Sequence, residues 1–361
     1  MTHVVVDARM AVSGGIGTYL QNLLPRVVAG RPGWSFTLLG DPHAMRSLGW
    51  SSLPNVQMQR CASSYYTLTE QVELPLRCPT SVDVFWAPHY NIPLLLRHRI
   101  VVTVHDVCHL ALPETTGGWL KQSYARVMFS QVGRRAATIL FDSEFSRAEL
   151  GRFAAARGRT AVAPLGVDES WFCARTSAPE RPLADPYLVY VGNWKRHKNI
   201  PALLRAFNRV LDRIPHRLVL IGRSEGLNAD PAIDRELSAL GERVLTTGEI
   251  SASALRRWVA HAAALVTASL YEGFGLPPLE AMAAGCPCLV SEAGSLPEVC
   301  GDAALYCDPR DESGVASRIV EIATDAELRN RLIASGRARA RDFTWERCAT
   351  ATLAELDRAV A

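Results

Sequence analysis

The sequence predicts an α/β protein built from two doubly wound parallel-sheet domains in series. Short apolar runs alternate with longer amphipathic stretches along the 361 residues, which is the pattern of parallel sheets covered by helices. The runs form two sets, separated by a segment at 171–185 that is rich in Pro, Ala and charge and has no clear period. The chain is long enough for two ordinary cores. We therefore expect one domain over 1–170, a linker over 171–185 and a second domain over 186–342.

The expected strands follow the apolar runs in order. In the first domain they are 3–7, 35–39, 84–87, 100–105, 138–142 and 160–163. In the second they are 187–191, 217–221, 243–246, 264–268, 286–290 and 304–306. Ligands of such sheets bind outside the carboxyl ends of the strands. We therefore expect the site in a crevice where the two domains face each other.

Composition excludes several classes of protein. A hydrophobic fraction of 48% with 21% charged residues describes a soluble globular chain. The apolar runs are too short to span a bilayer, and Asp7 and Arg9 interrupt the first run, which argues against a secretory signal. The nine cysteines show no metal-ligand spacing, and their odd number and scattered placement favour a reducing cytoplasm.

Charge is distributed unevenly. Residues 1–165 contain 16 Lys/Arg and 10 Asp/Glu, a net charge of +6, and the remainder contains 23 and 26, a net charge of −3. A basic first half suits anionic lipid headgroups or a phosphorylated acceptor, although an ordinary solvated surface is the more common explanation. No segment interleaves basic and aromatic residues as nucleic-acid modules do, so no nucleic-acid partner is expected.

The most informative segment is EGFGLPPLE at 272–280, which follows an apolar run. Proline suits the first position of a helix, so a helix is expected to begin near 277 or 278 and to end at Gly285. The backbone N–H groups of Gly275 and Leu276 would then lie at its positive end, which suits a phosphate. Glu272 and Glu280 flank that anion site and can accept hydrogen bonds from sugar hydroxyls. A nucleotide sugar fits this arrangement, whereas the alternative makes Glu280 a capping residue and Glu272 a solvated one.

Three other strand ends carry polar residues. The loop SGGIGTY at 13–19 allows close approach of a phosphate or sugar, but it lacks the third glycine of the dinucleotide fingerprint and could be a simple turn. The pair His105-Asp106 ends the strand 100–105, where a titratable pair is a functional candidate. The segment NWKRHKN at 193–199 follows Gly192 and places three cations after a strand. We interpret that segment as a diphosphate clamp, the alternative being a solvated charged face.

Together these segments resemble the large retaining glycosyltransferase family called glycosyl transferases group 1. The resemblance rests on GGIGTY at 14–19, TVHD at 103–106, DSEFSRAEL at 142–150, APLGVD at 163–168, YVGNWKRHKN at 190–199, TGEIS at 247–251 and the long motif at 264–309. It covers almost the whole chain and departs at Ala268, where the family generally has Pro. It implies the GT-B architecture of two Rossmann-like domains facing across a cleft, with the final helix, in 343–361, packing back on the first domain.

The resemblance also implies roles for individual residues. Glu272 lies near the donor sugar, Glu280 holds the ribose hydroxyls, and the amides of Phe274, Gly275 and Leu276 contact sugar and phosphate. Lys198 neutralises the diphosphate, His105 lies near the C6 hydroxyl of the transferred sugar, Ile250 contacts the base, and Gly15 lies near the phosphates and acceptor. The family arginine after Gly192 is Asn193 here, so Lys195 or Arg196 would have to substitute for it.

The implied reaction transfers a hexose to an acceptor hydroxyl with retention of configuration, using Glu272, His105 and Lys198 as catalytic residues. No Asp-x-Asp motif has nucleotide-site context, so neither a metal nor a cofactor is expected. Similarity to bacterial mannosyltransferases of polysaccharide and O-antigen assembly favours GDP-mannose as the donor, with UDP-glucose or another UDP-sugar as the alternative. The expected acceptor is a lipid-linked or growing oligosaccharide, and the expected location is cytoplasmic, peripheral to the inner face of the membrane. The rival functions are a nucleotide-sugar epimerase and a catalytically silent nucleotide-sugar-binding subunit.

Overall fold

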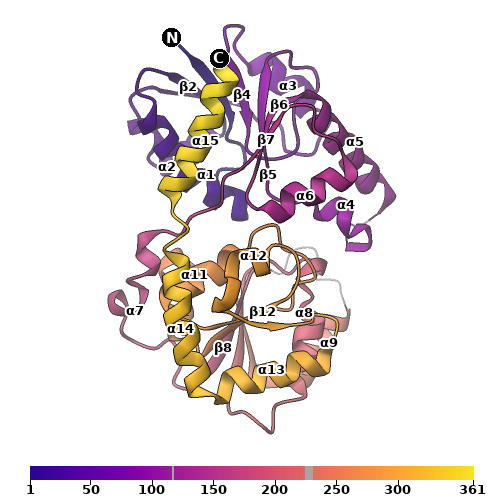
Figure 1. Ribbon diagram of the computed structural model, residues 1–361, viewed down its shortest axis with the longest axis vertical. Helices are drawn as coiled ribbons and strands as arrows, with labels where there is room; N and C mark the ends of the chain where they lie inside the picture. Colours follow the sequence, from indigo (N-terminus) through magenta and orange to yellow (C-terminus); the bar gives the residue numbers. More distant parts are fainter. Residues whose placement is uncertain (116–117, 224–230) are drawn as a thin grey trace. The chain divides into compact units, whose positions relative to one another are not determined.

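The computed structural model describes residues 1–115, 118–223 and 231–361. The chain folds into two compact units (Figure 1). The first unit comprises Met1–Gly166 together with Thr344–Ala361, and the second comprises Val167–Phe343. Each unit is a parallel sheet covered by helices, which confirms the predicted fold class.

The sheet of the first unit has the strand order β3-β2-β1-β4-β5-β6-β7, and all of its strand pairs are parallel. Its strands are β1 (His3–Asp7), β2 (Ser35–Gly40), β3 (Val56–Arg60), β4 (Val84–Ala87), β5 (Arg99–Val104), β6 (Ala136–Phe141) and β7 (Arg159–Val162). Its helices are α1 (Gly14–Gly30), α2 (Pro42–Ser47), α3 (Glu70–Arg77), α4 (Cys108–Ala111), α5 (Trp119–Arg135), α6 (Glu144–Phe153) and α15 (Trp345–Val360). The chain order reverses between β1 and β4, which makes that point the topological switch of the sheet.

The C-terminal helix α15 belongs to the first unit. It lies beside α1 (Figure 1) and also packs on strands β4 to β6. Trp345, Cys348 and Leu356 on its inner face are buried. The helix therefore helps to close the core around the central strands, where Val4, Val5 and Val6 have no exposed surface.

The sheet of the second unit has the order β10-β9-β8-β11-β12-β13, again with parallel pairs throughout. Its strands are β8 (Tyr187–Val191), β9 (Arg217–Ile221), β10 (Val244–Gly248), β11 (Ala264–Val266), β12 (Cys288–Ser291) and β13 (Leu305–Cys307). Its helices are α7 (Ala174–Ser177), α8 (Ile200–Asn208), α9 (Pro231–Leu240), α10 (Ala252–His261), α11 (Leu276–Ala284), α12 (Leu296–Cys300), α13 (Glu312–Thr324) and α14 (Ala326–Ala340).

Two details differ from the sequence expectations. Strand β3, with the sequence VQMQR, was not predicted, because this edge strand is only partly buried and has no apolar run. The segment 171–185, expected as a linker, belongs to the second unit: Trp171 is buried and α7 packs against α10. The boundary between the units therefore falls at Gly166, before this segment. Within its described residues, the chain has no helix long and apolar enough to cross a bilayer.

Candidate functional site

The centre of the candidate site in the second unit is an ion pair between Lys198 and Glu272. The ammonium nitrogen Nζ of Lys198 lies 2.8 Å from Oε1 and 2.7 Å from Oε2 of Glu272. Both side chains are mostly buried, with 19% and 15% of their surfaces exposed. The carboxylate of Glu272 thus bonds the same cation that was expected to neutralise the diphosphate.

Backbone contacts bring the two residues together. Lys198 ends a 3₁₀ turn after β8, and Glu272 lies in the loop after β11, the neighbouring strand. The N–H of Leu270 donates to the carbonyl oxygen of His197 at 2.7 Å, which joins the two loops. On the other side, the N–H of Ser295 donates to the carbonyl oxygen of Glu272 at 3.0 Å. The pair is therefore held by main-chain bonds at the carboxyl edge of the sheet.

The glycine loop after Glu272 leads into α11, which begins at Leu276. Gly275 is the N-cap residue and has a φ of 103°, a conformation that favours glycine. A Cβ atom there would lie 2.6 Å from Cδ2 of the buried Leu296. Because the first N–H groups of an α-helix lack intrahelical partners, this end of α11 can bind an anion. Phe274 is buried with its ring edge-on to Phe343, so its contribution to a ligand would come from its backbone.

Glu280 lies beyond the first turn of α11, which does not fit the alternative of a capping residue. Its side chain is only partly exposed and is hydrogen bonded to Trp171. Burial raises the pKa of Glu280 to about 8, and the negative charge of Asp168 adds to the rise. The Trp171 bond and the positive charge of Arg256 oppose it. The carboxyl group is therefore ready to ionise when hydrogen-bond donors, such as the hydroxyls of a ribose, reach it.

The other residues predicted to contact the donor are spread along the edge of the second sheet. Gly192 directly follows β8, and Gly222, after β9, packs so closely on it that a Cβ there would lie 2.2 Å from the Gly192 carbonyl oxygen. Arg196 is exposed in the same 3₁₀ turn as Lys198. Ile250 follows β10, which is two strands away from β8 in the sheet. The described site thus joins Lys198 to Glu272 and places Ile250 further along the same edge.

In the first unit, His105 is bonded at both ring nitrogens. Nδ1 lies 2.6 Å from Oδ2 of Asp142, and Nε2 lies 2.9 Å from the carbonyl oxygen of Pro88. Both partners are acceptors, so only the doubly protonated imidazolium satisfies both. Burial by itself would lower the pKa of His105, but the charge and hydrogen bond of Asp142 outweigh it and the pKa is raised.

The aspartate that pairs with His105 was not the one expected. Asp142 directly follows β6, the strand beside β5, whereas Asp106 accepts a bond from the N–H of Cys108 at 2.9 Å. The carbonyl oxygen of His105 also accepts a bond from the Ser146 hydroxyl at 3.0 Å. Since the ring nitrogens already have partners within the unit, a sugar hydroxyl would have to displace one of them to bond this side chain.

The glycine loop of the first unit is the beginning of a helix, because α1 starts at Gly14. A Cβ added at Gly15 would meet nothing within 4 Å, so the backbone there faces open space. At Gly17 it would lie 3.0 Å from the carbonyl oxygen of Ala11. Gly17 is therefore required by packing, whereas Gly15 leaves the backbone accessible to a ligand.

A buried polar network at the end of β1 was missed from the sequence. Arg9 bonds both carboxylate oxygens of Asp7, at 2.8 and 2.7 Å, and contacts Glu70 at 2.7 Å. Nδ1 of His89 accepts the N–H of Asn91 at 3.1 Å, so its Nε2 donates to Asp7, also at 3.1 Å, and the ring is neutral. Burial alone would raise the pKa of Asp7, but the Arg9 and His89 bonds hold it well below its usual range. The sequence signal was the Asp7–Arg9 pair inside an apolar run.

Comparisons with known proteins agree with this architecture. Over its whole length the chain resembles a sucrose-phosphate synthase from Thermosynechococcus elongatus, with a TM-score of 0.78, 21% identity and coverage of 99% of this chain and 98% of that one. The Anabaena protein HepE, solved with UDP-glucose, gives a TM-score of 0.76 at 17% identity, with 99% and 100% covered. These likenesses define the fold as that of the GT-B glycosyltransferases.

Sequence similarity defines the family. The family described as "Glycosyl transferases group 1" matches residues 185–325. O-antigen chain mannosyltransferase B of Escherichia coli is 31% identical over 285 residues, 75% of this chain and 73% of the relative. O-antigen chain mannosyltransferase RfbU of Salmonella typhimurium is 28% identical over 65% of this chain and 63% of its own length. The chain belongs to the glycosyl transferases group 1 family.

Proposed function

We propose that this protein transfers mannose from GDP-mannose to a hydroxyl of a lipid-linked or growing oligosaccharide, with retention of configuration. The observation that carries the proposal is the Lys198–Glu272 pair beside the amino end of α11. It combines a cation, a helix end suited to phosphate and a carboxylate suited to sugar hydroxyls. Synthesis of a bacterial surface polysaccharide, such as the O-antigen of lipopolysaccharide, is the proposed setting because two relatives carry that description.

The proposed chemistry needs no metal ion and no cofactor. As the glycosidic bond to the diphosphate breaks, negative charge grows on the leaving phosphate, and Lys198 and the first N–H groups of α11 stabilise it. The acceptor hydroxyl attacks from the same face and gives its proton to the leaving phosphate. Glu272 holds hydroxyls of the donor sugar, and Glu280 those of the ribose.

The family resemblance supports the roles proposed for the remaining residues. The amides of the loop before α11 bind the phosphates, with Arg196 as a further exposed cation and Ile250 beside the base. In the first unit, Gly15 leaves room for the acceptor. The imidazolium of His105 is proposed to act near the transferred sugar as a fixed positive charge with a bound partner on each nitrogen.

The choice of mannose rests on the relatives. A third one, the MMP alpha-(1->4)-mannosyltransferase of Mycolicibacterium hassiacum, is 30% identical over 65% of this chain and 57% of its own length. UDP-glucose remains the alternative donor, since HepE was solved with it. Because Asn193 replaces the family arginine, a subunit that binds a nucleotide sugar without turnover is a second alternative. A nucleotide-sugar epimerase is a third, and it would act on the donor without an acceptor.

The first experiment is thermal stabilisation of the purified protein by nucleoside diphosphates and nucleotide sugars, with and without EDTA. A ligand at about 100 times its dissociation constant adds roughly 2.7 kcal/mol to the free energy of unfolding. Selective stabilisation by GDP and GDP-mannose that survives EDTA and is lost in Lys198→Ala is the expected result. Stabilisation by UDP ligands in preference to GDP ligands would show that the donor is a UDP-sugar. No stabilisation by any nucleotide would contradict the proposed donor site.

A cytoplasmic location at the inner face of an anionic membrane is also part of the proposal. Helix α5 exposes Trp119, Leu120 and Val127, with 72%, 65% and 53% of their surfaces accessible. The same helix contains Lys121 and Arg126, both exposed, and has no acidic residue. Such a combination of apolar and basic side chains suits an interface rich in anionic lipids. Sedimentation with vesicles of phosphatidylglycerol but not phosphatidylcholine, lost in Trp119→Ser with Leu120→Ser, is expected; equal binding by the variant would contradict it.

A further inference from the structure

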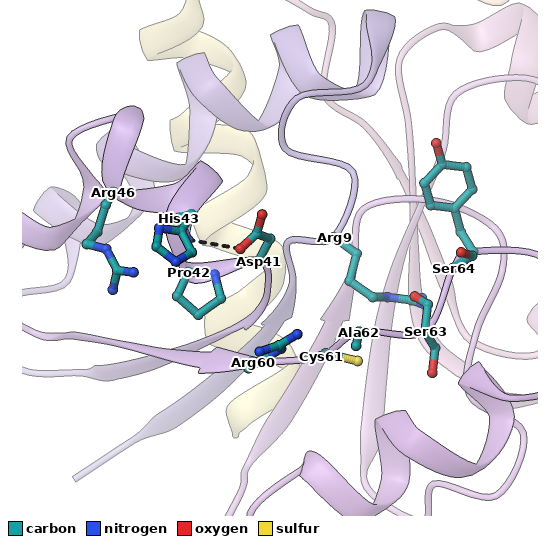
Figure 2. A pocket seen from close by; sticks show the side chains of 11 residues that line it. Arg9, Asp41, Pro42, His43, Arg46, Arg60, Cys61, Ala62, Ser63 and Ser64 are labelled. Atoms are coloured by element: carbon teal, nitrogen blue, oxygen red, sulfur yellow. Dashed lines mark hydrogen bonds between the residues drawn. The ribbon is translucent and has the colours of Figure 1, made fainter.

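The first unit contains a cavity of about 670 Å³ at the carboxyl ends of three neighbouring strands (Figure 2). Arg9 follows β1, Asp41 follows β2, and Arg60 ends β3. These strands are adjacent in the sheet, so the segments that follow them lie along one edge. The cavity lies on the β1-β2-β3 side of the topological switch, away from the pair of His105 and Asp142 that follows β5 and β6. None of the donor residues discussed above lines it.

Two arginines that line the cavity have no carboxylate partner among the described residues. Arg46 of α2 and Arg60 are both exposed, and neither forms an ion pair with a carboxylate in the described part of the chain. Asp41 is the acidic residue of the lining, and its Oδ1 accepts the N–H of His43 at 2.9 Å as the cap of α2. The cavity therefore contains two guanidinium groups whose donors are free for a ligand.

The carboxylates behind the cavity wall are bonded to other groups, and that of Glu73 accepts the N–H groups of Ala62 and Ser63 at 3.0 and 2.7 Å. Asp7 and Glu70 are buried and bond to Arg9, which lines the cavity while they do not. The remaining nitrogen of Arg9, Nη1, donates to the carbonyl oxygen of Ser63 at 3.1 Å. Arg9 thus forms part of the wall with four of its five guanidinium N–H donors already bonded, whereas the guanidinium groups of Arg46 and Arg60 have no partner among the described residues.

The cavity also borders the glycine loop at the start of α1. Tyr65 lines the cavity, and its hydroxyl lies 3.4 Å from Oγ of Ser13, the N-cap residue of that helix. Gly15, two residues further on, has its backbone facing open space. A molecule seated in the cavity could therefore extend along Tyr65 toward Gly15, which the family resemblance implies lies near the phosphates and acceptor.

We propose that this cavity binds a phosphate or diphosphate group of the acceptor, held between Arg46 and Arg60. Planar guanidinium groups match phosphate oxygens with paired hydrogen bonds. The volume exceeds that of a phosphate, which leaves room for an attached sugar or lipid chain. The inference rests on the proposed function, and it adds that the acceptor of this enzyme is anionic. A lipid diphosphate and a free sugar phosphate would present the same chemistry to the cavity.

Binding is best measured in the Lys198→Ala background, where the donor site has lost its phosphate cation. Inorganic pyrophosphate is titrated calorimetrically into this protein and into versions that also carry Arg46→Gln or Arg60→Gln. Each of these substitutions is expected to weaken pyrophosphate binding about tenfold. Arg157→Gln is the matched control, because Arg157 is an exposed arginine of the same unit that lies before β7, at the opposite edge of the sheet. It should leave the affinity unchanged.

Two further probes identify the source of the phosphate. Tighter binding of decyl diphosphate than of pyrophosphate would assign the cavity to a lipid-linked acceptor, and tighter binding of glucose 1-phosphate would assign it to a free sugar phosphate. Equal affinities in the Arg46→Gln, Arg60→Gln and Arg157→Gln proteins, or no binding of any probe, would overturn the proposal. The affinity for GDP, measured in Arg46→Gln with Lys198 intact, separates failure of the cavity proposal from failure of the proposed function. Normal GDP binding shows a folded protein with a working donor site, and failure of GDP to bind even the unmodified protein contradicts the proposed function instead.

Discussion

Replacing Glu272 and replacing Lys198 should change the affinity for GDP in opposite directions. The carboxylate of Glu272 lies 2.7 and 2.8 Å from the ammonium group of Lys198. A diphosphate must compete with that carboxylate for the same cation. Glu272→Gln removes the competing charge and leaves the cation in place, so GDP should bind more tightly. Lys198→Ala removes the cation, so GDP should bind more weakly.

The size of the effect follows from the burial of the pair. Hydrogen bonds to charged groups contribute about 1.5–3 kcal/mol, and partial exposure of both side chains reduces this through solvent screening. A competing term of about 1 kcal/mol predicts an affinity gain of about fivefold in Glu272→Gln. Lys198→Ala should lose about tenfold or more, because it removes a charge-assisted phosphate contact.

Isothermal titration with GDP at low salt measures both effects. Glu292→Gln, an exposed glutamate after β12, is the matched control and should bind GDP normally. Mannosyl transfer should fall in both site variants, since Glu272 is also proposed to hold the donor sugar. If Glu272→Gln weakened GDP binding as Lys198→Ala does, the competition between carboxylate and diphosphate would be refuted.

Three further predictions concern single groups. Asp142→Asn should lower the pKa of His105, measured by NMR titration, and an unchanged pKa would contradict the pairing. Because the pKa of His105 is raised in the folded protein, the stability that this pair contributes is complete below pH 6.5. It is lost as the pH rises through the pKa of the folded state. Glu280, with a pKa raised to about 8, should release a proton when GDP binds at pH 7, seen by calorimetry in buffers of different ionisation enthalpy and absent in Glu280→Gln. Equal proton release by both proteins would count against its role. Gly275→Ala should destabilise the protein to denaturant by about 2 kcal/mol, from the left-handed backbone and the clash with Leu296; unchanged stability would show that the loop can rearrange.

The sequence was sufficient for most of the fold because buried parallel strands read as apolar runs. The observed ends of the expected strands differ from the predicted ones by at most two residues. Strand β3 was missed because it lies at the partly buried edge of the sheet and its polar side chains form no apolar run. The segment 171–185 has the composition of a linker, and only its tertiary contacts, such as the burial of Trp171, assign it to the second unit.

The candidate site was predictable where neighbouring strands end close together. Lys198 and Glu272 follow β8 and β11, so the topology alone brings them to one edge. The same kind of adjacency brings Asp142, which follows β6, to His105 after β5, but the sequence reasoning paired His105 with Asp106, its neighbour in the chain. The proposed binding and catalytic roles of these side chains stay predictions.

The chain passes from the first unit to the second after Gly166 and returns after Phe343, so the second unit is a continuous insertion in the first. The N–H of Val167 donates to the carbonyl oxygen of Phe343 at 3.1 Å, so the insertion begins and ends at adjacent points. Gly166 packs just as closely on the other side of the boundary, where a Cβ atom would lie 2.1 Å from the backbone nitrogen of Trp345. Residues 167–343 could therefore be exchanged as a single cassette between relatives, with both splice points held together by main-chain contacts and Gly166 kept as glycine.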